Sequence, residues 1–113
     1  MHEVALAQGI VDLVAERAQV DGFTKVLKVH VVIGALSTVM PEALQFGFDG
    51  AAMGTVVEGA SLEIHEVEGE AYCTDCERRF STRSRLATCP SCQSVRCMVT
   101  GGDELRVSEL EVE

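Results

Sequence analysis

The sequence predicts an α+β fold, in which a small three-stranded sheet with two helices carries an inserted zinc-ribbon-like module. Three observations lead to this prediction. Apolar residues recur with helical spacing in two segments, they alternate as in strands in three others, and two Cys-x-x-Cys pairs flank residues 77–88. A chain of 113 residues has room for one core domain and one small appended module.

Composition and charge narrow the class of protein. A hydrophobic content of 47% with only two prolines is typical of a globular chain. No apolar run approaches the roughly 18 residues that cross a bilayer, so we expect no membrane span and a cytoplasmic location. The net charge of −9 argues against binding to nucleic acid or to an anionic membrane surface.

The first element is an amphipathic helix from Met1 to about Gln19. Glu3 falls in its first turn, where the helix dipole favours a carboxylate, and Asp21-Gly22 ends it. Its apolar stripe repeats every three or four residues and consists of Val4, Ala7, Val11, Val14 and Ala18, widened by Ile10 and Leu13.

A strand follows from Lys25 to Gly34. Alternation places one apolar set toward the core, and Lys28, His30 and Val32 on the more polar face. We therefore expect His30 to be a solvated surface histidine. The core set comprises Leu27, Val29, Val31 and Ile33.

The second helix begins at Met40-Pro41-Glu42, because proline is favoured at the first helical position, and Gly54 stops it. The predicted core face of this helix consists of Leu44, Phe48 and Ala51, supported by Phe46 and Met53.

The remaining strands complete the sheet. Residues 61–72 read as one strand with a solvated His65 and an exposed acidic face, 96–100 as a short strand, and 105–112 as the last strand. In the last strand the apolar residues change phase between Val107 and Leu110, which indicates a bulge or a strong twist. The strands 27–33, 62–67 and 105–112 form one sheet with both helices on one face.

The two cysteine turns predict a structural zinc site. Each Cys-x-x-Cys turn points two thiolates at one place, and two turns complete the tetrahedral sulfur cage that Zn²⁺ prefers. The ligands are Cys73, Cys76, Cys89 and Cys92. Such a cage has no open position for water, so we expect no catalysis by this metal. Cys97 stands outside the pattern as a buried or idle thiol.

This arrangement divides the chain into an α/β domain of residues 1–70 and 98–113 and a zinc-binding insertion of residues 71–97. No dinucleotide, phosphate-loop or Ser-His-Asp pattern occurs, so we predict no enzyme. Two alternatives remain open. The cysteine pairs suit a thiol oxidoreductase, and the arginine-rich loop suits a zinc ribbon that docks on nucleic acid or transcription machinery. The arginines are Arg78, Arg79, Arg83, Arg85 and Arg96.

His2 offers a second metal site. A histidine at position two can chelate a metal through the terminal amine, a deprotonated amide and the imidazole, and such nitrogen donors suit Ni²⁺ or Cu²⁺. A solvent-exposed terminal histidine without a metal fits the same residues.

The chain closely resembles the HypA/HybF family of nickel-incorporation proteins for [NiFe]-hydrogenase maturation. The resemblance rests on the opening Met-His-Glu, on residues 33–37 and 41–46 (Ile-Gly-Ala-Leu-Ser and Pro-Glu-Ala-Leu-Gln-Phe), and on the paired Cys-x-x-Cys motifs. It covers essentially the whole chain. It implies a metallochaperone with Ni²⁺ as cargo, in which His2 is the central nickel ligand, assisted by backbone nitrogens and in some members by Glu3, and the four paired cysteines hold structural Zn²⁺.

The resemblance also implies partners, namely a HypB-type GTPase and the precursor of the [NiFe]-hydrogenase large subunit as recipient. Some members carry an acidic residue near the start of the second helix that assists at the nickel site, and Met40 occupies that place here. Either Glu42 substitutes for it, or a backbone nitrogen or water completes the ligand set. The sequence does not decide between a monomer and a homodimer.

Overall fold

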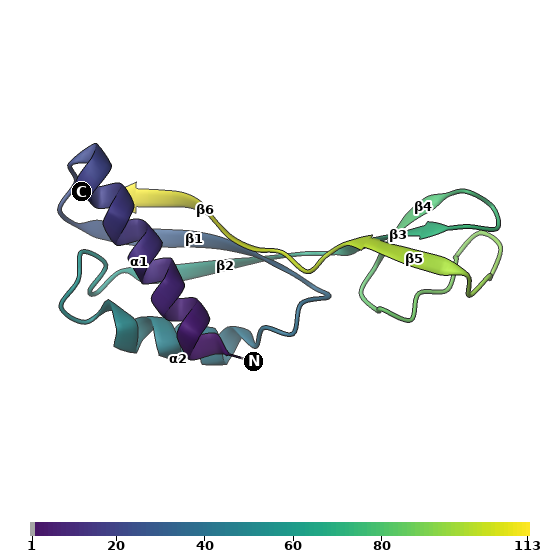
Figure 1. The fold of residues 1–113 in the computed structure, drawn as a ribbon, viewed down its shortest axis with the longest axis horizontal. Coiled ribbons are helices and arrows are strands. Elements are labelled where there is room, and N and C mark those ends of the chain that lie inside the picture. The colour runs from purple at the N-terminus through teal and green to yellow at the C-terminus, as the bar shows by residue number, and fades with distance from the viewer. Residues whose placement is uncertain (1) are drawn as a thin grey trace. The chain divides into compact units, whose positions relative to one another are not determined.

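A computed structural model describes residues 2–113 and has the predicted α+β class (Figure 1). The elements in chain order are α1 (Glu3–Asp21), β1 (Val26–Gly34), α2 (Pro41–Ala52), β2 (Ser61–Val67), β3 (Gly69–Cys73), β4 (Arg79–Thr82), β5 (Cys97–Gly101) and β6 (Leu105–Val112). The strands form two three-stranded sheets, with orders β2-β1-β6 and β4-β3-β5.

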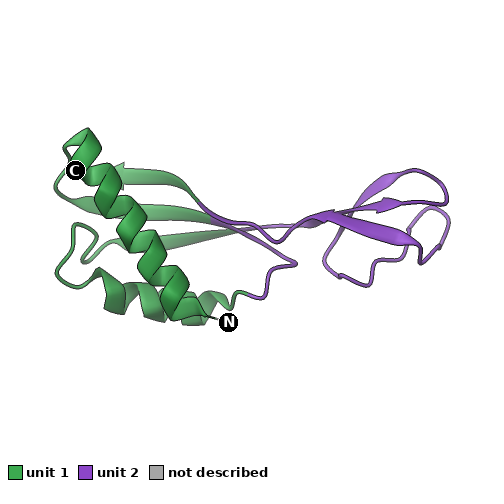
Figure 2. Ribbon diagram, viewed as in Figure 1, with its two compact units in different colours: residues 1–31, 39–65, 107–113 green, residues 32–38, 66–106 purple. Residues whose placement is uncertain are grey.

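The chain divides into two compact units (Figure 2). Unit 1 comprises residues 1–31, 39–65 and 107–113, and unit 2 comprises residues 32–38 and 66–106. The segment 71–97, with all four paired cysteines, lies inside unit 2. The assignment of one part to nickel and the other to zinc stays a prediction.

The sheet β2-β1-β6 joins strands from both ends of the sequence. β6 runs antiparallel to β1, because Glu113 N–H donates to the carbonyl of Lys25 at one end (3.1 Å) and Gly34 N–H to that of Glu104 at the other (2.8 Å). β1 and β2 run in the same direction and are connected through α2, as the chain colours in Figure 1 show. This is the sheet predicted from the three alternating segments.

Helix α1 packs by the predicted stripe, but over a narrower face. Ala7, Ile10, Val11, Val14 and Ala18 are buried, whereas Val4 and Leu13 are exposed, which corrects their assignment to the core. Gly22 ends the helix as expected: its backbone has φ +80°, and its N–H donates to the carbonyl of Ala18 (2.8 Å).

Helix α2 also buries one face, and the prediction assigned two residues to it wrongly. Leu44, Phe48 and Ala52 are buried and the predicted core residue Ala51 is half-buried, but Phe46 is 80% and Met53 73% exposed. The helical period explains this, since a residue two positions from both Leu44 and Phe48 lies on the opposite side. Gly47 occupies the buried face instead, where an added Cβ would lie 3.3 Å from the Cβ of Ala7. The missing side chain lets α2 approach α1 closely.

The predicted single strand 61–72 is two strands, divided at Glu68 and belonging to different sheets. At this break, unit 2 is packed so closely that Gly69 and Gly102 have no room for a side chain. A Cβ on Gly69 would lie 2.4 Å from Leu36 Cδ1, and one on Gly102 would lie 2.4 Å from Gly69 Cα. Strand β4 was not predicted; it pairs with β3 from Gly69↔Thr82 to Tyr72↔Arg79.

Three residues of β1 differ from the prediction. Leu27 is 46% exposed and Val26 is buried in its place, and Val32, which was predicted on the more polar face, is buried as well. His30 is not a solvated surface residue, because its side chain is only 17% exposed and bonds to His65 and Glu111. The exposed His65 likewise has a partner in His30.

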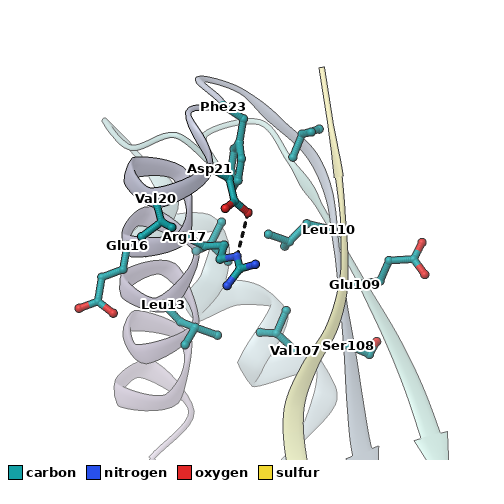
Figure 3. Close-up of a pocket in the computed structure, with 12 residues that line it drawn as sticks. Leu13, Glu16, Arg17, Val20, Asp21, Phe23, Val107, Ser108, Glu109 and Leu110 are labelled. Carbon is teal, nitrogen blue, oxygen red and sulfur yellow. Dashed lines mark hydrogen bonds and ion pairs between the residues drawn. The ribbon is translucent and has the colours of Figure 1, made fainter.

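A groove of about 870 Å³ lies between α1 and β6 in unit 1 (Figure 3). Leu13 and Val20 line it from the helix, and Val107 and Leu110 from the strand. Among residues 2–113, neither helix is long and apolar enough to cross a membrane.

Candidate metal centres

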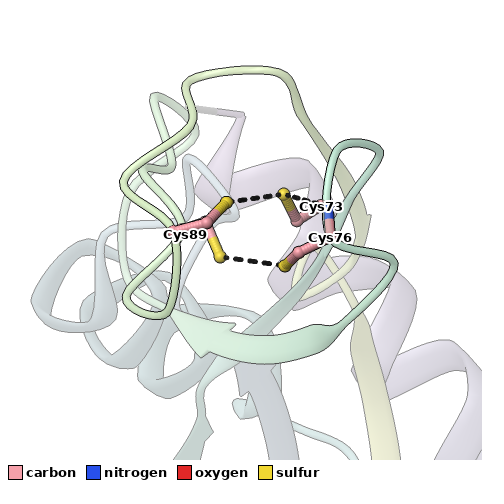
Figure 4. Close-up of side chains that lie close together, drawn as sticks. Cys73, Cys76 and Cys89 are labelled. Carbon is pink, nitrogen blue, oxygen red and sulfur yellow. Dashed lines mark hydrogen bonds between the residues drawn. The ribbon is translucent and has the colours of Figure 1, made fainter.

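The four paired cysteines converge on one point in unit 2 (Figure 4). Their sulfur atoms all lie within 4.8 Å of one another. The contacts cross between the two turns: Cys73 Sγ is 3.6 Å from Cys92 Sγ, and Cys76 Sγ is 3.6 Å from Cys89 Sγ. The sequence prediction of a four-cysteine cluster is therefore confirmed.

The two cysteine turns share one backbone design. In the first, Cys73 N–H donates to the carbonyl of Arg78, and Glu77 N–H donates to the carbonyl of Cys73. In the second, Cys89 N–H donates to Ser94 and Gln93 N–H donates to Cys89, all four bonds being 2.9 Å long. Glu77 and Gln93 both have a positive φ, of 60° and 62°. The sequence therefore builds the same thiolate-presenting turn twice.

The spacing of the sulfur atoms fits zinc. Four thiolates at about 2.3 Å from a tetrahedral Zn²⁺ have sulfur–sulfur edges of about 3.8 Å. Two pairs that cross between the turns are 3.6 Å apart. Only small outward shifts of the side chains would seat the metal. The donor set thus suits a structural zinc ion, and its four sulfurs leave no place for a reacting water.

Local hydrogen bonds favour the thiolate form of the first cysteine in each turn. The backbone N–H of Cys76 lowers the pKa of the Cys73 thiol to about 6, and that of Cys92 lowers the pKa of Cys89. Burial raises the pKa of the Cys76 thiol to about 12. Two ligands are therefore disposed to ionise before the metal arrives, and the metal must displace protons from the others.

Cys97 stands beside the cage without joining it. It is half-buried opposite Cys73 in the β3–β5 pair, and its thiol donates to the carbonyl of Ser94 (3.5 Å). Burial raises the pKa of this thiol, so it is a poor nucleophile. Its assignment as a buried or idle thiol stays a prediction.

Three of the five arginines near the cage have partners within unit 2. Arg83 forms an ion pair with Glu66, and Arg96 forms one with Asp75. Arg85 donates from Nε and Nη2 to the carbonyl of Leu36 (3.2 and 3.0 Å). These bonds use the guanidinium groups for folding, which weakens the alternative of a nucleic-acid-binding ribbon.

The predicted nickel residues lie at the start of α1. His2 is exposed and is the N-cap residue, with a left-handed backbone (φ 61°) unusual for a residue other than glycine. Its carbonyl accepts the N–H of Leu6 (2.9 Å), the first bond of the helix. The terminal amine of Met1, the other predicted chelating group, lies outside the described residues.

Glu3 ties this segment to α2. Its carboxylate accepts the backbone N–H of Met40, the N-cap residue of α2, at 3.0 Å. Met40, where the resemblance led us to look for an acidic side chain, thus provides a backbone donor, while its own side chain is 58% exposed. Glu3 lies at the N-terminal ends of two helices, which both favour a carboxylate. Glu42 is exposed in the first turn of α2.

Sequence reasoning missed a further cluster in unit 1. Ligand atoms of His30, Glu109 and Glu111 lie within 4.8 Å of one another. The phase change in the last strand was the available signal, because it moves acidic side chains to the other face of the sheet. His30 and His65 are on different strands, so the pattern within either strand does not indicate that they are neighbours across the sheet.

Comparison with known proteins gives a consistent family match. A family model described as hydrogenase/urease nickel incorporation, metallochaperone, hypA matches residues 1–112. The chain is 49% identical over 113 residues to hydrogenase maturation factor HypA 2 of Bradyrhizobium diazoefficiens, with the full length of both chains covered. It is 47% identical, again over the full length of both, to hydrogenase maturation factor HypA of Azotobacter chroococcum.

Solved structures agree with the fold. The solution structure of the Ni metallochaperone HypA from Helicobacter pylori matches with a TM-score of 0.71 at 27% identity, covering 99% of this chain and 97% of that one. A second solution structure, of a HypA protein, matches with a TM-score of 0.73 at 27% identity, covering 100% and 97%.

Proposed function

The chain belongs to the HypA family of hydrogenase and urease nickel-incorporation metallochaperones, and we propose on this premise that it binds Ni²⁺ at its N-terminal segment and delivers the ion for maturation of a [NiFe]-hydrogenase. The observation that carries this proposal is the match of the family model over residues 1–112, together with an exposed His2 at the helix start.

The ligand set follows from the groups at this end of α1. The His2 imidazole and nearby backbone nitrogens are donors that suit a square-planar Ni²⁺. Glu3 adds a carboxylate that is already fixed by Met40 N–H, so it either binds the ion or holds the segment in place. An exposed site supports delivery, because a partner can reach the ion and remove it.

The remaining parts of the proposal follow the family. Zn²⁺ in the four-cysteine cage is structural, and Ni²⁺ is the cargo. The protein acts in the cytoplasm with a HypB-type GTPase, and the recipient is the precursor of the [NiFe]-hydrogenase large subunit. The proposed activity is transfer of Ni²⁺ to the recipient, and not catalysis.

Equilibrium dialysis of the zinc-loaded, untagged protein against Ni²⁺ tests the site. His2→Gln is expected to lose the nickel ion bound at this segment, because it removes the imidazole donor. A short extension before Met1 is expected to weaken binding if the amine or first amides are ligands. Undiminished nickel binding by His2→Gln would refute the site. Undiminished binding by the extended protein would remove only the amine from the ligand set.

A matched pair of variants distinguishes the roles of Glu3, in the first turn of α1, and Glu42, in the first turn of α2. Glu3→Gln is expected to weaken nickel binding, whereas Glu42→Gln, the same change in the first turn of α2, is expected to leave it unchanged. The opposite result would make Glu42 the carboxylate that substitutes for the acidic residue of other members.

A further inference from the structure

Three strands of unit 1 bring four ionisable side chains together on one face of the sheet. His65 of β2, His30 of β1 and Glu111 of β6 form a row across the sheet order β2-β1-β6. His30 Nδ1 is 2.9 Å from His65 Nε2, and His30 Nε2 is 2.7 Å from Glu111 Oε2. The two rings stack with their centroids 5.2 Å apart. Both nitrogens of His30 thus have a defined partner.

The change of phase in β6 supplies the fourth group. In a regular strand, residues three apart point to opposite faces. Val107 and Leu110 nevertheless both line the groove and point toward α1, whereas Glu109, which also borders the groove, directs its carboxylate away from α1 (Figure 3). The irregularity therefore moves Glu109 and Glu111 to the side of His30, where their ligand atoms lie within 4.8 Å of each other and of its imidazole. Bulges commonly redirect a side chain in this way.

We propose that His30, Glu109 and Glu111 bind a second divalent transition-metal ion, with His65 as the residue that orients His30. One imidazole nitrogen and two carboxylate oxygens suit first-row ions such as Ni²⁺, Co²⁺ and Zn²⁺. The two carboxylates balance the charge of the ion. Both are exposed, so water completes its coordination.

The hydrogen bonds of His30 define how it would accept a metal. An ionised carboxylate only accepts hydrogen bonds, so Nε2 carries the proton that faces Glu111 in the metal-free protein. Metal binding at Nε2 requires the proton to sit on Nδ1, which faces Nε2 of His65. His65 then accepts that proton's hydrogen bond, which is the usual outer support of a metal-bound histidine.

A hydrogen-bonded ladder that only stabilises the sheet is the competing explanation, and it predicts different behaviour. Such a ladder has no need for Glu109, which the His30 contacts at 2.7 and 2.9 Å do not include. A metal site needs both carboxylates. Lys28, the nearby cation of β1, is paired with Glu63 of β2 (3.8 Å), and its charge also helps His30 to lower the pKa of Glu111.

Calorimetric titration with Ni²⁺ tests the proposal in zinc-loaded, full-length protein that carries His2→Gln, so that the N-terminal site is removed. We expect one equivalent of Ni²⁺ to bind to this protein. Adding His30→Asn, Glu109→Gln or Glu111→Gln should weaken that binding by at least about tenfold, and His65→Gln should weaken it by about 10–100-fold, as loss of an outer partner does. Glu63→Gln, a control carboxylate on β2, should have no effect.

The outcomes distinguish this site from the proposed N-terminal one. Absence of nickel binding in the His2→Gln protein, or binding unaffected by Glu109→Gln and Glu111→Gln, would overturn the second site. If the N-terminal proposal alone failed, His2→Gln would bind as much Ni²⁺ as the wild type, and His30→Asn would still remove one equivalent. Because Glu109 and Glu111 are exposed, their variants are expected to fold. Paramagnetic broadening of the residue 30, 109 and 111 amides by Ni²⁺ gives an independent readout.

Discussion

The two units of this protein are stabilised by different chemistry. The large side chains that are almost completely buried in unit 1 are all apolar: Val11, Val14, Val26, Val29, Val31, Leu44, Phe48 and Val57. In unit 2, the only members of the same group among the described residues are Cys73 and Cys89. The interior of unit 1 is a hydrocarbon core, whereas in unit 2 the metal ligands Cys73 and Cys89 are buried beside a few apolar residues, Ile33, Leu36 and Ala71 among them.

This difference indicates how each unit depends on its surroundings. Burial of apolar area stabilises unit 1 whether or not a metal is present. Unit 2 has a short sheet, with strands of four and five residues, and small domains of this kind require a metal or disulfides to fold. Zinc binding and folding should therefore be linked in unit 2 and independent in unit 1.

The largest expected effect is the loss of zinc from unit 2. Structural zinc sites contribute about 10–16 kcal/mol in isolated peptides at neutral pH, more than a module of this size obtains from its core. Cys76→Ser should therefore unfold residues 69–101, while the amides of α1 and α2 keep their native dispersion in a two-dimensional NMR spectrum. Cys97→Ser, which changes a thiol beside the cage, should leave both units folded.

If the amides of residues 69–101 kept their native dispersion in Cys76→Ser, the apolar contacts of unit 2 would be sufficient for its folding. Unit 2 would then not differ from unit 1 in its dependence on zinc. Unfolding of α1 in the same variant would show that the two units are one cooperative structure. A chelator should reproduce the effect in the wild type, and added Zn²⁺ should reverse it.

A core truncation in unit 1 should have the next largest effect. Phe48→Ala removes a completely buried ring and is expected to lower the free energy of unfolding of unit 1 by about 3–5 kcal/mol. Phe46→Ala removes a ring of the same size from the same helix, but this ring is 80% exposed, so the change should stay within about 0.5 kcal/mol. Denaturant unfolding followed by circular dichroism measures both.

Zinc content is the second readout for this pair of variants. Phe48→Ala should retain its full zinc content at denaturant concentrations that unfold the helices. Release of zinc together with helix unfolding, or equal destabilisation by the two variants, would contradict the separation of the two units.

The same two kinds of chemistry explain what the sequence could predict. The cysteine cage was predictable because each Cys-x-x-Cys turn is local, and its backbone bonds lie within six adjacent residues, 73–78 and 89–94. The predicted bounds of both helices lie close to the observed ones, because the helical period and the Gly22 cap are local signals as well. The sheet β2-β1-β6 followed from the alternation of apolar residues.

Most of the errors concern contacts between distant segments. Phe46 is the exception, because it is two positions from both Leu44 and Phe48 and the helical period alone places it on the opposite, exposed side of α2. The segment around Glu68 has no turn residue before Gly69, and the separation of the two strands follows from their membership of different sheets. His30 and His65 were each assigned to solvent because their partner is 35 residues away in the sequence.

The smallest expected effect comes from the ion pair that connects the two cysteine turns. Asp75 in the first turn accepts hydrogen bonds from Arg96 and from the hydroxyl of Ser94, near the second turn. Arg96 holds the pKa of Asp75 below its usual range. The stabilisation by this carboxylate is thus present above about pH 3.9, the ordinary aspartate value, and is lost only as the pH falls through its lowered pKa.

Asp75→Asn at neutral pH should therefore remove the whole contribution of the ion pair, and that contribution should be small. The side chains of Arg96 and Asp75 are 75% and 36% exposed, so solvent screens their attraction. The N–H and hydroxyl of Thr74 also donate to the carbonyl of Arg96 (3.0 and 2.8 Å), and these bonds still connect the same segments in the variant. Competition with a chromophoric chelator should detect a change in zinc affinity of less than about fivefold, as for other exposed ion pairs. Asp103→Asn, an exposed carboxylate of unit 2 far from the cage in sequence, is the control. A loss of zinc affinity as large as that in Cys76→Ser would mean that the salt bridge, and not the thiolates alone, holds the two turns together.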